Sequence, residues 1–429
     1  MAERRHRIVI VGGGFGGLAA AKALKHVDAD VVLIDRRNHH LFQPLLYQVA
    51  TAALSPSEIA WPIRHLLRRH SNVRVLMATV TGVDTAARAV LLEDGSREPY
   101  DSLVLATGAQ HGYFGNDQWA DFAPGLKTIE DATAIRRLLL MSLEAAERET
   151  DPEKRRALLT FAIIGAGPTG VEMAGAIVEL GHASLKGQFQ TIDPRHLRVV
   201  LIEAGDRVLS NFLPELSDYT LNSLRRMGVE VELNQPVKSI DANGIDYGDK
   251  RLDTKTIVWA AGVAASPAAK WLGIDADKAG RIAVEPDVTV PGLPDVYVIG
   301  DVASIRQENG KPVPGVAPAA KQAGQYVAGA ISARLRGQPV APFRYKHAGD
   351  LATIGKQSAV IDFGWTRLTG RLAWWVWGFA HIYFLVETRT RIFITMSWLW
   401  IYLTGQRSAR LITHGMAPEK KPLKELDEA

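Results

Sequence analysis

Residues 8–24 read Ile8-Val-Ile-Val-Gly12-Gly-Gly14-Phe-Gly-Gly17-Leu-Ala-Ala-Ala-Lys-Ala-Leu24. The β-branched run before the glycines predicts a buried strand, and the alanine-rich run after them predicts a helix. The three numbered glycines have the spacing G-x-G-x-x-G, which gives a tight turn, lets the backbone approach a pyrophosphate and lets the helix pack on the strand. The helix start also offers free N–H groups to phosphate. This stretch predicts an α/β unit that binds a dinucleotide.

A second predicted strand, residues 30–34, ends at Asp35, eighteen residues after Gly17. A carboxylate at this spacing can accept hydrogen bonds from ribose hydroxyls. Strand, glycines, helix and acid in this order favour a ligand site over the alternative, a glycine-rich turn that binds nothing.

The same pattern returns in mid-chain. Residues 158–164 are a predicted strand, residues 171–177 are a predicted helix, and Gly165, Gly167 and Gly170 between them repeat the glycine spacing. The sequence therefore predicts a second dinucleotide unit, the alternative being a degenerate repeat without a second ligand.

The acid of the second unit lies further along the chain than that of the first. The next predicted strand, residues 197–202, ends at Glu203, 33 residues after Gly170, so we expect an insertion at about residues 181–196. A carboxylate there would repel a 2′-phosphate and favour NADH over NADPH, although the nearby Arg207 works against that preference.

Composition limits the chemistry. The chain has 429 residues, enough for two or three domains, and no cysteine. It therefore lacks disulfides, cysteine-ligated iron–sulfur clusters and nucleophilic thiols, and redox chemistry requires an organic cofactor or a metal site without thiolates. A net charge of +4 is too small over this length to indicate nucleic-acid binding. The pair His39-His40 has no carboxylate at the spacing of a helical metal site, which favours a packing role over metal binding. No apolar export signal precedes the first predicted strand, which favours a cytosolic location.

Three further strands end at comparable motifs, in residues 103–108, 257–262 and 296–301. With the two glycine motifs they resemble the two-dinucleotide-domain flavoprotein reductases, in which FAD occupies the first site and a nicotinamide nucleotide the second. Two such units are the arrangement needed to pass a hydride from nicotinamide to flavin. For Asp301, a helix N-cap is an alternative that is compatible with contact to the cofactor.

The resemblance implies two sets of cofactor contacts. For FAD they are Gly12, Gly14, Phe15, Gly16, Gly17, Asp35, Arg36, Val80, Ala106, Thr107, Gly108, Asp301, Ala317 and Pro318. For NADH they are Gly165, Gly167, Pro168, Thr169, Gly170, Glu203, Ala261 and Gly262.

The missing cysteines narrow the resemblance, because disulfide reductases and sulfide:quinone oxidoreductases use them. Residues 41–50, residues 165–172 and the tail resemble the type II NADH:quinone oxidoreductases over nearly the whole chain. That resemblance implies a membrane quinone as acceptor, no proton pumping, a homodimer, and monotopic attachment to the cytoplasmic face of the inner membrane. The expected fold class is α/β, with two Rossmann-like domains and a C-terminal amphipathic helical membrane-binding region.

The C-terminal part of the chain has a distinctive composition. Residues 365–415 hold six arginines, one acid and six of the ten tryptophans. The predicted helices, residues 372–386 and 392–404, are too short to cross a bilayer core, which needs about 20 residues. Aromatic faces flanked by Arg367, Arg371, Arg389, Arg391, Arg407 and Arg410 suit the headgroup boundary. The alternative is a dimer interface or a covering for the core.

The expected quinone motif departs from the family. Where relatives have glutamines four residues apart, this chain has Pro318 and Gln322, so the side chain of residue 318 offers no polar contact to the quinone. Gln322 and Lys321 are candidate quinone-site residues, with an ordinary helix-surface role as the alternative. The family also suggests a role for Glu172 in proton supply or quinone response, and the alternative is a carboxylate stabilised by a helix N-terminus.

These observations predict five segments and one activity. We expect an FAD domain in residues 1–115 and 280–345, an NADH domain in 116–279, a membrane-attachment and dimerisation region in 346–415 and a disordered tail in 416–429. The expected activity is hydride transfer from NADH to FAD and electron transfer to quinone. A soluble reductase with a protein acceptor and a flavin-bound redox sensor remain alternatives. Truncation after about Lys346 is expected to abolish membrane attachment while sparing transfer of hydride from NADH to the flavin.

Overall fold

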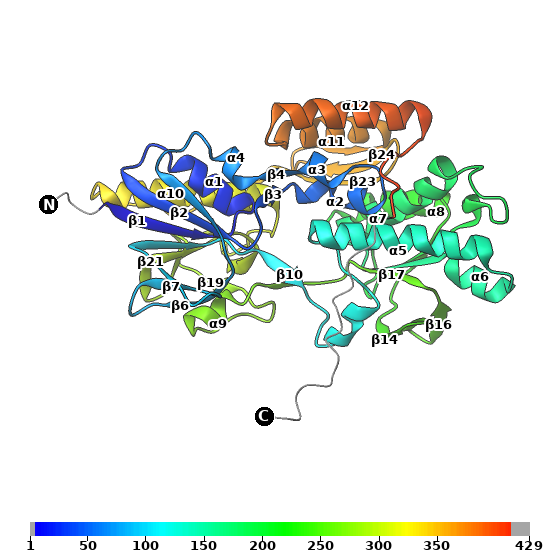
Figure 1. Ribbon diagram of the computed structural model, residues 1–429, viewed down its shortest axis with the longest axis horizontal. Coiled ribbons are helices and arrows are strands. Elements are labelled where there is room, and N and C mark those ends of the chain that lie inside the picture. The colour runs from blue at the N-terminus through cyan, green and yellow to red at the C-terminus, as the bar shows by residue number, and fades with distance from the viewer. Residues whose placement is uncertain (1–4, 413–429) are drawn as a thin grey trace, which may run out of the picture.

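The computed structural model describes residues 5–412, so the predicted tail at 416–429 lies outside the described residues. Its first unit is a six-stranded sheet in the order β20-β21-β9-β1-β2-β5, parallel except for β20 (Figure 1). The strands are β1 His6–Val11, β2 Ala29–Asp35, β5 Val73–Met77, β9 Ser102–Leu105, β20 Thr289–Val290 and β21 Leu293–Val298. The apolar residues 8–11 of β1 and 103–105 of β9 are buried, as expected for a parallel sheet covered on both faces.

Helices and small sheets complete this unit. Helix α1 begins in the glycine turn, and α10 lies against it, since a Cβ on Gly324 would meet the Gly16 carbonyl oxygen at 2.1 Å. The elements are α1 Phe15–Ala23, α4 Ile63–Leu66, α9 Ala268–Leu272, η5 Gly300–Val302, α10 Ala317–Leu335, the antiparallel β6 Val80–Asp84, β7 Ala89–Leu92 and β8 Arg97–Pro99, and the pair β19 Ile282–Ala283 and β22 Ala303–Ser304.

The second unit repeats the first on a smaller scale, with a parallel sheet in the order β13-β12-β11-β17. Its strands are β11 Thr160–Ile164, β12 Arg198–Ile202, β13 Val229–Glu232 and β17 Thr256–Trp259, followed by the meander β14 Val237–Asp241, β15 Gly244–Tyr247 and β16 Lys250–Asp253. Its helices are α5 Ile129–Arg148, α6 Pro152–Leu158, α7 Pro168–Glu179 and α8 Pro214–Arg226. The expected insertion is present between α7 and β12, as short helical turns at Leu180–Ser184 and Pro194–His196.

Two connections join the units. The antiparallel pair β10 Ala109–His111 and β18 Val263–Ala265 crosses between them (Figure 1). An excursion from the first unit also packs on α5 and α7 of the second. Its elements are β3 His39–Leu41, η1 Gln43–Leu45, α2 Leu46–Ala50, α3 Pro56–Ile59 and β4 Ala60–Pro62, and a further turn, η2 Asp117–Asp121, follows β10.

The C-terminal region contains a sheet that the sequence analysis did not predict. Antiparallel strands β23 Asp350–Gly355, β24 Ser358–Asp362 and β25 Arg367–Thr369 precede α11 Gly370–Phe384 and α12 Thr388–Thr404. The sheet lies against α7, because a Cβ on Gly175 would meet the Ile354 carbonyl oxygen at 1.8 Å. In Figure 1 the two helices lie on the other side of this sheet, at one edge of the molecule. Truncation after Lys346 would therefore remove buried core residues as well as the helices.

Candidate functional site

The first glycine turn has the geometry of a phosphate cradle. Gly12 has φ +104°, and a Cβ on it would lie 2.3 Å from the Ala106 carbonyl oxygen. A Cβ on Gly17 would lie 1.8 Å from the Gly12 carbonyl oxygen, whereas one on Gly14 would meet nothing within 4 Å. The first and third glycines are required by packing, and the space before Gly14 at the start of α1 is free for a pyrophosphate.

The second turn repeats this geometry. Gly165 has φ +98°, and a Cβ on it would meet Ala261 at 2.5 Å. A Cβ on Gly170 would lie 1.8 Å from the Gly165 carbonyl oxygen, and one on Gly167 would again meet nothing within 4 Å. The chain thus presents two cradles of the same construction, and both fit a dinucleotide.

The two acids fix these turns. Asp35 accepts hydrogen bonds from the amides of Gly13 at 2.6 Å and Arg37 at 2.7 Å. Glu203 accepts them from Ala166 at 2.6 Å and Gly205 at 2.8 Å. Each carboxylate has further lone pairs for ribose hydroxyls.

Arg207, the residue that could offset Glu203, is engaged elsewhere. Its guanidinium donates to the Ser210 carbonyl oxygen at 3.2 Å and lies 4.0 Å from Asp206. Neither contact involves Glu203, so within residues 5–412 Arg207 does not form an ion pair with the carboxylate at the end of β12.

The remaining predicted FAD residues come from several elements of the first unit. Arg36 is exposed beside Asp35, Val80 is buried at the start of β6, and the Thr107 hydroxyl bonds to that of Ser266. Asp301 lies inside the short helix η5, whose N-cap is Ile299, so the N-cap interpretation of Asp301 is wrong. Ala317 and Pro318 form the first turn of α10, where proline loses no helical hydrogen bond.

His40 is also explained by packing. Its Nδ1 lies 3.0 Å from the Gly13 carbonyl oxygen, and burial lowers its pKa to about 4. The pKa places the ring in its neutral form at neutral pH, beside the backbone of the glycine turn.

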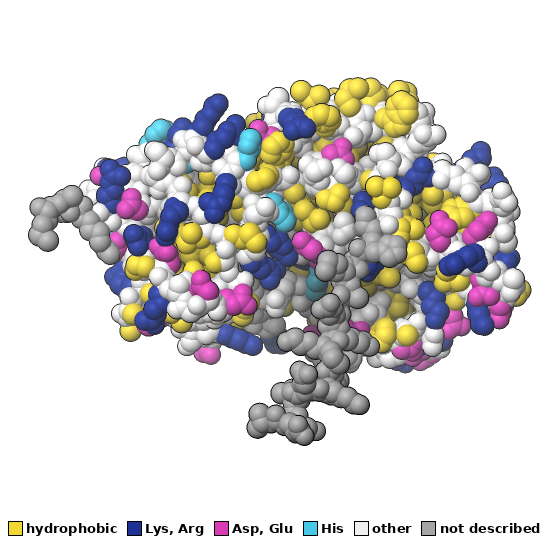
Figure 2. Space-filling view, viewed as in Figure 1, with side chains coloured by type: hydrophobic (Ala, Val, Ile, Leu, Met, Phe, Trp, Pro, Cys, Tyr) yellow, Lys and Arg dark blue, Asp and Glu magenta, His cyan; other side chains and the backbone are white. Residues whose placement is uncertain are grey.

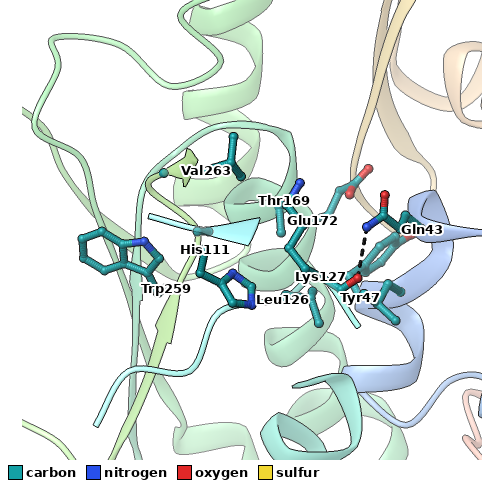
Figure 3. A pocket seen from close by; sticks show the side chains of 12 residues that line it. Gln43, Tyr47, His111, Leu126, Lys127, Thr169, Glu172, Trp259 and Val263 are labelled. Carbon is teal, nitrogen blue, oxygen red and sulfur yellow. Dashed lines mark hydrogen bonds between the residues drawn. The ribbon is translucent and has the colours of Figure 1, made fainter. Parts of the chain in front are cut away.

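A pocket lies where the two units and the excursion meet. Glu172 and Thr169 of α7 lie between Tyr47 and Gln43 on one side and His111 and Trp259 on the other (Figure 3). The other residues that line it are Leu46, Leu126, Lys127, Ala260, Gly262 and Val263. Thr169 belongs to the second glycine turn, and Gly262 lies just after β17 and is one of the expected NADH contacts, so the pocket continues from the second cradle toward the first unit.

Glu172 is the acid of this pocket. Burial raises its pKa from 4.5 to about 8, and a hydrogen bond to the Thr353 backbone opposes part of that shift. No acidic residue lies in the first turn of α7, so stabilisation by the helix N-terminus does not account for the position of Glu172. At neutral pH this site holds a protonated carboxyl group that can donate its proton.

Glu172 makes a testable contribution to stability. Because its pKa is higher in the folded chain, proton binding favours folding; this contribution is complete below about pH 4.5 and is lost as the pH rises through about 8. Glu172→Gln keeps a neutral side chain at every pH. We expect the melting temperature of the variant, relative to the unchanged chain, to rise from about pH 5 to about pH 8 and then to level off. Thermal melts across this range check it, and a pH-independent difference contradicts it.

The predicted quinone residues have other partners. The Gln322 amide donates to the Lys346 carbonyl oxygen and accepts from the Lys346 amide, both at 2.9 Å. The Lys321 ammonium lies 5.8 Å from the centre of the Phe384 ring of α11. Both residues thus lie where α10 meets the C-terminal region, and the Gln322 amide holds the chain that leads into it.

Sequence reasoning missed much of the pocket wall. Tyr47 lies within residues 41–50, but nothing local in the sequence marks it, and His111 and Lys127 are single polar residues in connecting segments. His111 bonds to Asp131 of α5 at 3.0 Å and is packed against Gly125, where a Cβ would overlap its ring. These residues meet only because the two units pack together.

The C-terminal helices expose a broad apolar surface. Among residues 5–412, no helix has the length and hydropathy to cross a bilayer, as the helix lengths predict. The exposed side chains include Phe379 at 67%, Tyr383 at 71%, Trp400 at 58% and Leu403 at 71%. Figure 2 shows hydrophobic side chains gathered over this edge of the molecule.

Two of the six arginines do not belong to this surface. Arg407 is only 4% exposed and donates to the carbonyl oxygens of Thr51 and Ala176. Arg410 donates to the Ser184 carbonyl oxygen. Trp377 is likewise buried, so the prediction that all these arginines and tryptophans lie at a headgroup boundary is wrong for part of the set.

The comparisons with known proteins agree with this architecture. The model of the pyridine nucleotide-disulphide oxidoreductase family matches residues 6–324, and that of the NDH2 C-terminal domain matches residues 347–407. The type II NADH:quinone oxidoreductase Ndh of Mycobacterium tuberculosis is 44% identical, over 99% of this chain and 94% of the relative. A type II NADH:quinone oxidoreductase of Staphylococcus haemolyticus is 30% identical, over 87% and 93%.

Among solved structures, that of NDH2 from Plasmodium falciparum in complex with NADH has the same fold. It superposes with a TM-score of 0.87 at 22% identity and covers 95% of this chain and 100% of that one. With the two glycine cradles and the C-terminal region, these matches settle the family: the chain belongs to the pyridine nucleotide-disulphide oxidoreductases and, within them, to the type II NADH:quinone oxidoreductases.

Proposed function

We propose that this chain oxidises NADH through a bound FAD and passes two electrons to a membrane quinone without pumping protons. The observation that carries the proposal is the pair of matching glycine cradles, the second of which opens into the Glu172 pocket, in a chain whose C-terminal helices have an exposed apolar face. FAD, when bound, supplies the ring that accepts a hydride and releases electrons. We assign FAD to the first unit, which comprises residues 1–115 and 280–345 together with α9, and NADH to the remainder of residues 116–279.

The protein contributes position, charge and a proton. The N-termini of α1 and α7 would present backbone N–H groups to the two pyrophosphates, and Asp35 and Glu203, which hold the turns, would accept hydrogen bonds from ribose hydroxyls. Glu172 holds a proton in the pocket near neutral pH, and the conversion of a quinone to a quinol consumes two protons. Lys321, Gln322 and the turn at Ala317–Pro318 are proposed to border the quinone entrance beside α11.

Anaerobic visible spectroscopy of detergent-purified protein tests this function. We expect NADH to bleach the flavin band and a short-chain quinone to restore it. Bleaching without restoration by any quinone would contradict the acceptor and favour a protein acceptor, whereas the absence of a flavin band would contradict the FAD site.

Attachment to the membrane is proposed to use the apolar face of α11 and α12. Replacing Phe379, Trp400 and Leu403 together with glutamine should lower liposome flotation at least about tenfold, because each side chain contributes roughly 1.5–3 kcal/mol when buried. A matched control replaces Met77, Met141 and Leu335, which are exposed apolar side chains outside α11 and α12. Flotation assays compare the two triple variants, and equal flotation would refute the assignment. NADH should bleach the flavin in both.

The side of the membrane and the oligomeric state belong to the same proposal. We place the chain on the cytoplasmic face of the inner membrane as a homodimer that uses part of the C-terminal region. Light scattering in detergent tests the dimer, and protease accessibility in inverted and right-side-out vesicles tests the side.

A further inference from the structure

A chain of hydrogen bonds runs from the surface helix α12 into the wall of the pocket. The indole Nε1 of Trp398 donates to Gln48 Oε1 at 2.7 Å, and Gln48 Nε2 donates to the Tyr47 hydroxyl at 2.9 Å. Gln48 and Tyr47 are buried, and Tyr47 lines the pocket with Glu172. Residues from opposite ends of the sequence thus meet at one site.

Trp398 determines which way the Gln48 amide faces. An indole N–H can only donate, so the atom facing it must be the amide oxygen. The amide nitrogen then faces Tyr47, and the hydroxyl oxygen must accept. The one proton of the Tyr47 hydroxyl is therefore free to point away from Gln48. Without the indole, the amide could rotate and take that proton instead.

The free proton of the Tyr47 hydroxyl can be donated to a group in the pocket. Burial raises the pKa of Tyr47 well above 10, so the hydroxyl remains a neutral donor across the physiological range. Of the nearby polar groups, Gln43 already donates to the Lys127 carbonyl oxygen at 3.0 Å, whereas Glu172 lies close enough to act electrostatically on Tyr47. The Tyr47 hydroxyl is thus an oriented donor beside the pocket acid.

We propose that Trp398 and Gln48 are positioning residues that hold the Tyr47 hydroxyl as a hydrogen-bond donor to a ring-attached carbonyl oxygen of a substrate in the Glu172 pocket. The inference rests on the proposed function, since nicotinamide and quinone both carry such an oxygen. The same hydrogen bonds connect the pocket to the packing of α12 on α11, because Trp398 stacks on Trp377 of α11 with ring centres 5.4 Å apart.

The test compares Tyr47→Phe, Trp398→Phe and the control Trp375→Phe in full-length protein, with flavin reduction by NADH and reoxidation by quinone followed separately. Trp375 is the matched control because it lies on the neighbouring helix α11, is 49% exposed, and its indole makes no hydrogen bond within residues 5–412. We expect one half-reaction to slow roughly fivefold in Tyr47→Phe and Trp398→Phe, as the loss of one hydrogen bond predicts, and neither to change in the control. Slower reduction identifies the nicotinamide carboxamide as the partner, and slower reoxidation identifies the quinone.

Two further measurements separate positioning from general damage. Trp398→Phe should have no additional effect in the Tyr47→Phe background, since it acts only through that hydroxyl. In spectra of ¹⁵N-indole-labelled protein, the resonance that Trp398→Phe removes should move in Gln48→Leu, independently of activity.

The proposal is overturned if Trp398→Phe matches the control in both half-reactions, if its effect is undiminished without the Tyr47 hydroxyl, or if the indole resonance does not move. Failure of every quinone to reoxidise the unchanged chain would instead refute the proposed function. In that case the rates of flavin reduction by NADH and the indole spectra would still test the role of Trp398 and Gln48.

Discussion

Replacing Gly167 with alanine is expected to give a folded protein that retains FAD but is no longer reduced by NADH. Gly167 has φ −69° and ψ −177°, which any residue adopts, and a Cβ there would meet no protein atom within 4 Å. The added methyl group would instead occupy the place of the pyrophosphate at the start of α7. Loss of two hydrogen bonds to the charged phosphates, each worth roughly 1.5–3 kcal/mol, should weaken NADH binding at least about a hundredfold.

Titration of the flavin band with NADH measures this effect, and two other glycines serve as controls. Gly329→Ala in α10 also adds a methyl group into open space, but away from both cradles, and should leave the titration unchanged. Gly14→Ala should give the opposite phenotype, in which FAD is lost from a folded chain. Reduction of Gly167→Ala at ordinary NADH concentrations would show that the second cradle does not hold the nucleotide.

The glycine cradles could be predicted because the sequence pattern that marks them is local, although the close packing at Gly12 also involves the distant Ala106. Six residues fix the turn, and the strand and helix beside it follow from periodicity, so predicted residues 8–11 and 30–34 lie within β1 His6–Val11 and β2 Ala29–Asp35. The C-terminal helices were predicted for the same reason. The first was predicted at 372–386 and is observed at Gly370–Phe384, two residues earlier at each end. The second was predicted at 392–404 and is observed at Thr388–Thr404, so it begins four residues earlier.

The pocket could not be predicted in this way. Tyr47, His111 and Glu172 come from three separate segments, and their proximity depends on how the two units pack. The sheet β23–β25 was missed for a related reason. Its buried β24 strand, Ser358–Asp362, is short and apolar, and its partner surface on α7 lies almost two hundred residues earlier in the chain. Composition describes what a segment contains, but not which surface covers it.

Arg407 shows the consequence most clearly. Counted with its neighbours, it belongs to a basic, tryptophan-rich tail that suits a membrane surface. In the structure, its guanidinium donates to Thr51 at 2.8 Å and Ala176 at 3.0 Å and lies 3.2 Å from Glu179. The Arg407 side chain, whose charge suggested exposure, is buried and links the chain after α12 to the excursion and to α7.

Replacing Arg407 with alanine is therefore expected to lower the free energy of unfolding by about 3–5 kcal/mol, because it leaves the Glu179 carboxylate unpaired and the Thr51 carbonyl without this donor. Arg410→Ala removes a nearby, less buried arginine and should cost at most about 1 kcal/mol. Urea denaturation of both variants measures the difference, and equal losses would contradict the assignment.

A double variant separates the unpaired charge from the lost packing. Arg407→Met with Glu179→Gln removes both charges while keeping most of the side-chain volume, so it should be more stable than Arg407→Met alone. If the two are equally unstable, the loss comes from packing and not from the stranded carboxylate. Because α7 also carries Glu172, a chain that loses the Arg407 contacts should in addition show a changed pH dependence at the pocket, which links the end of the chain to its chemistry.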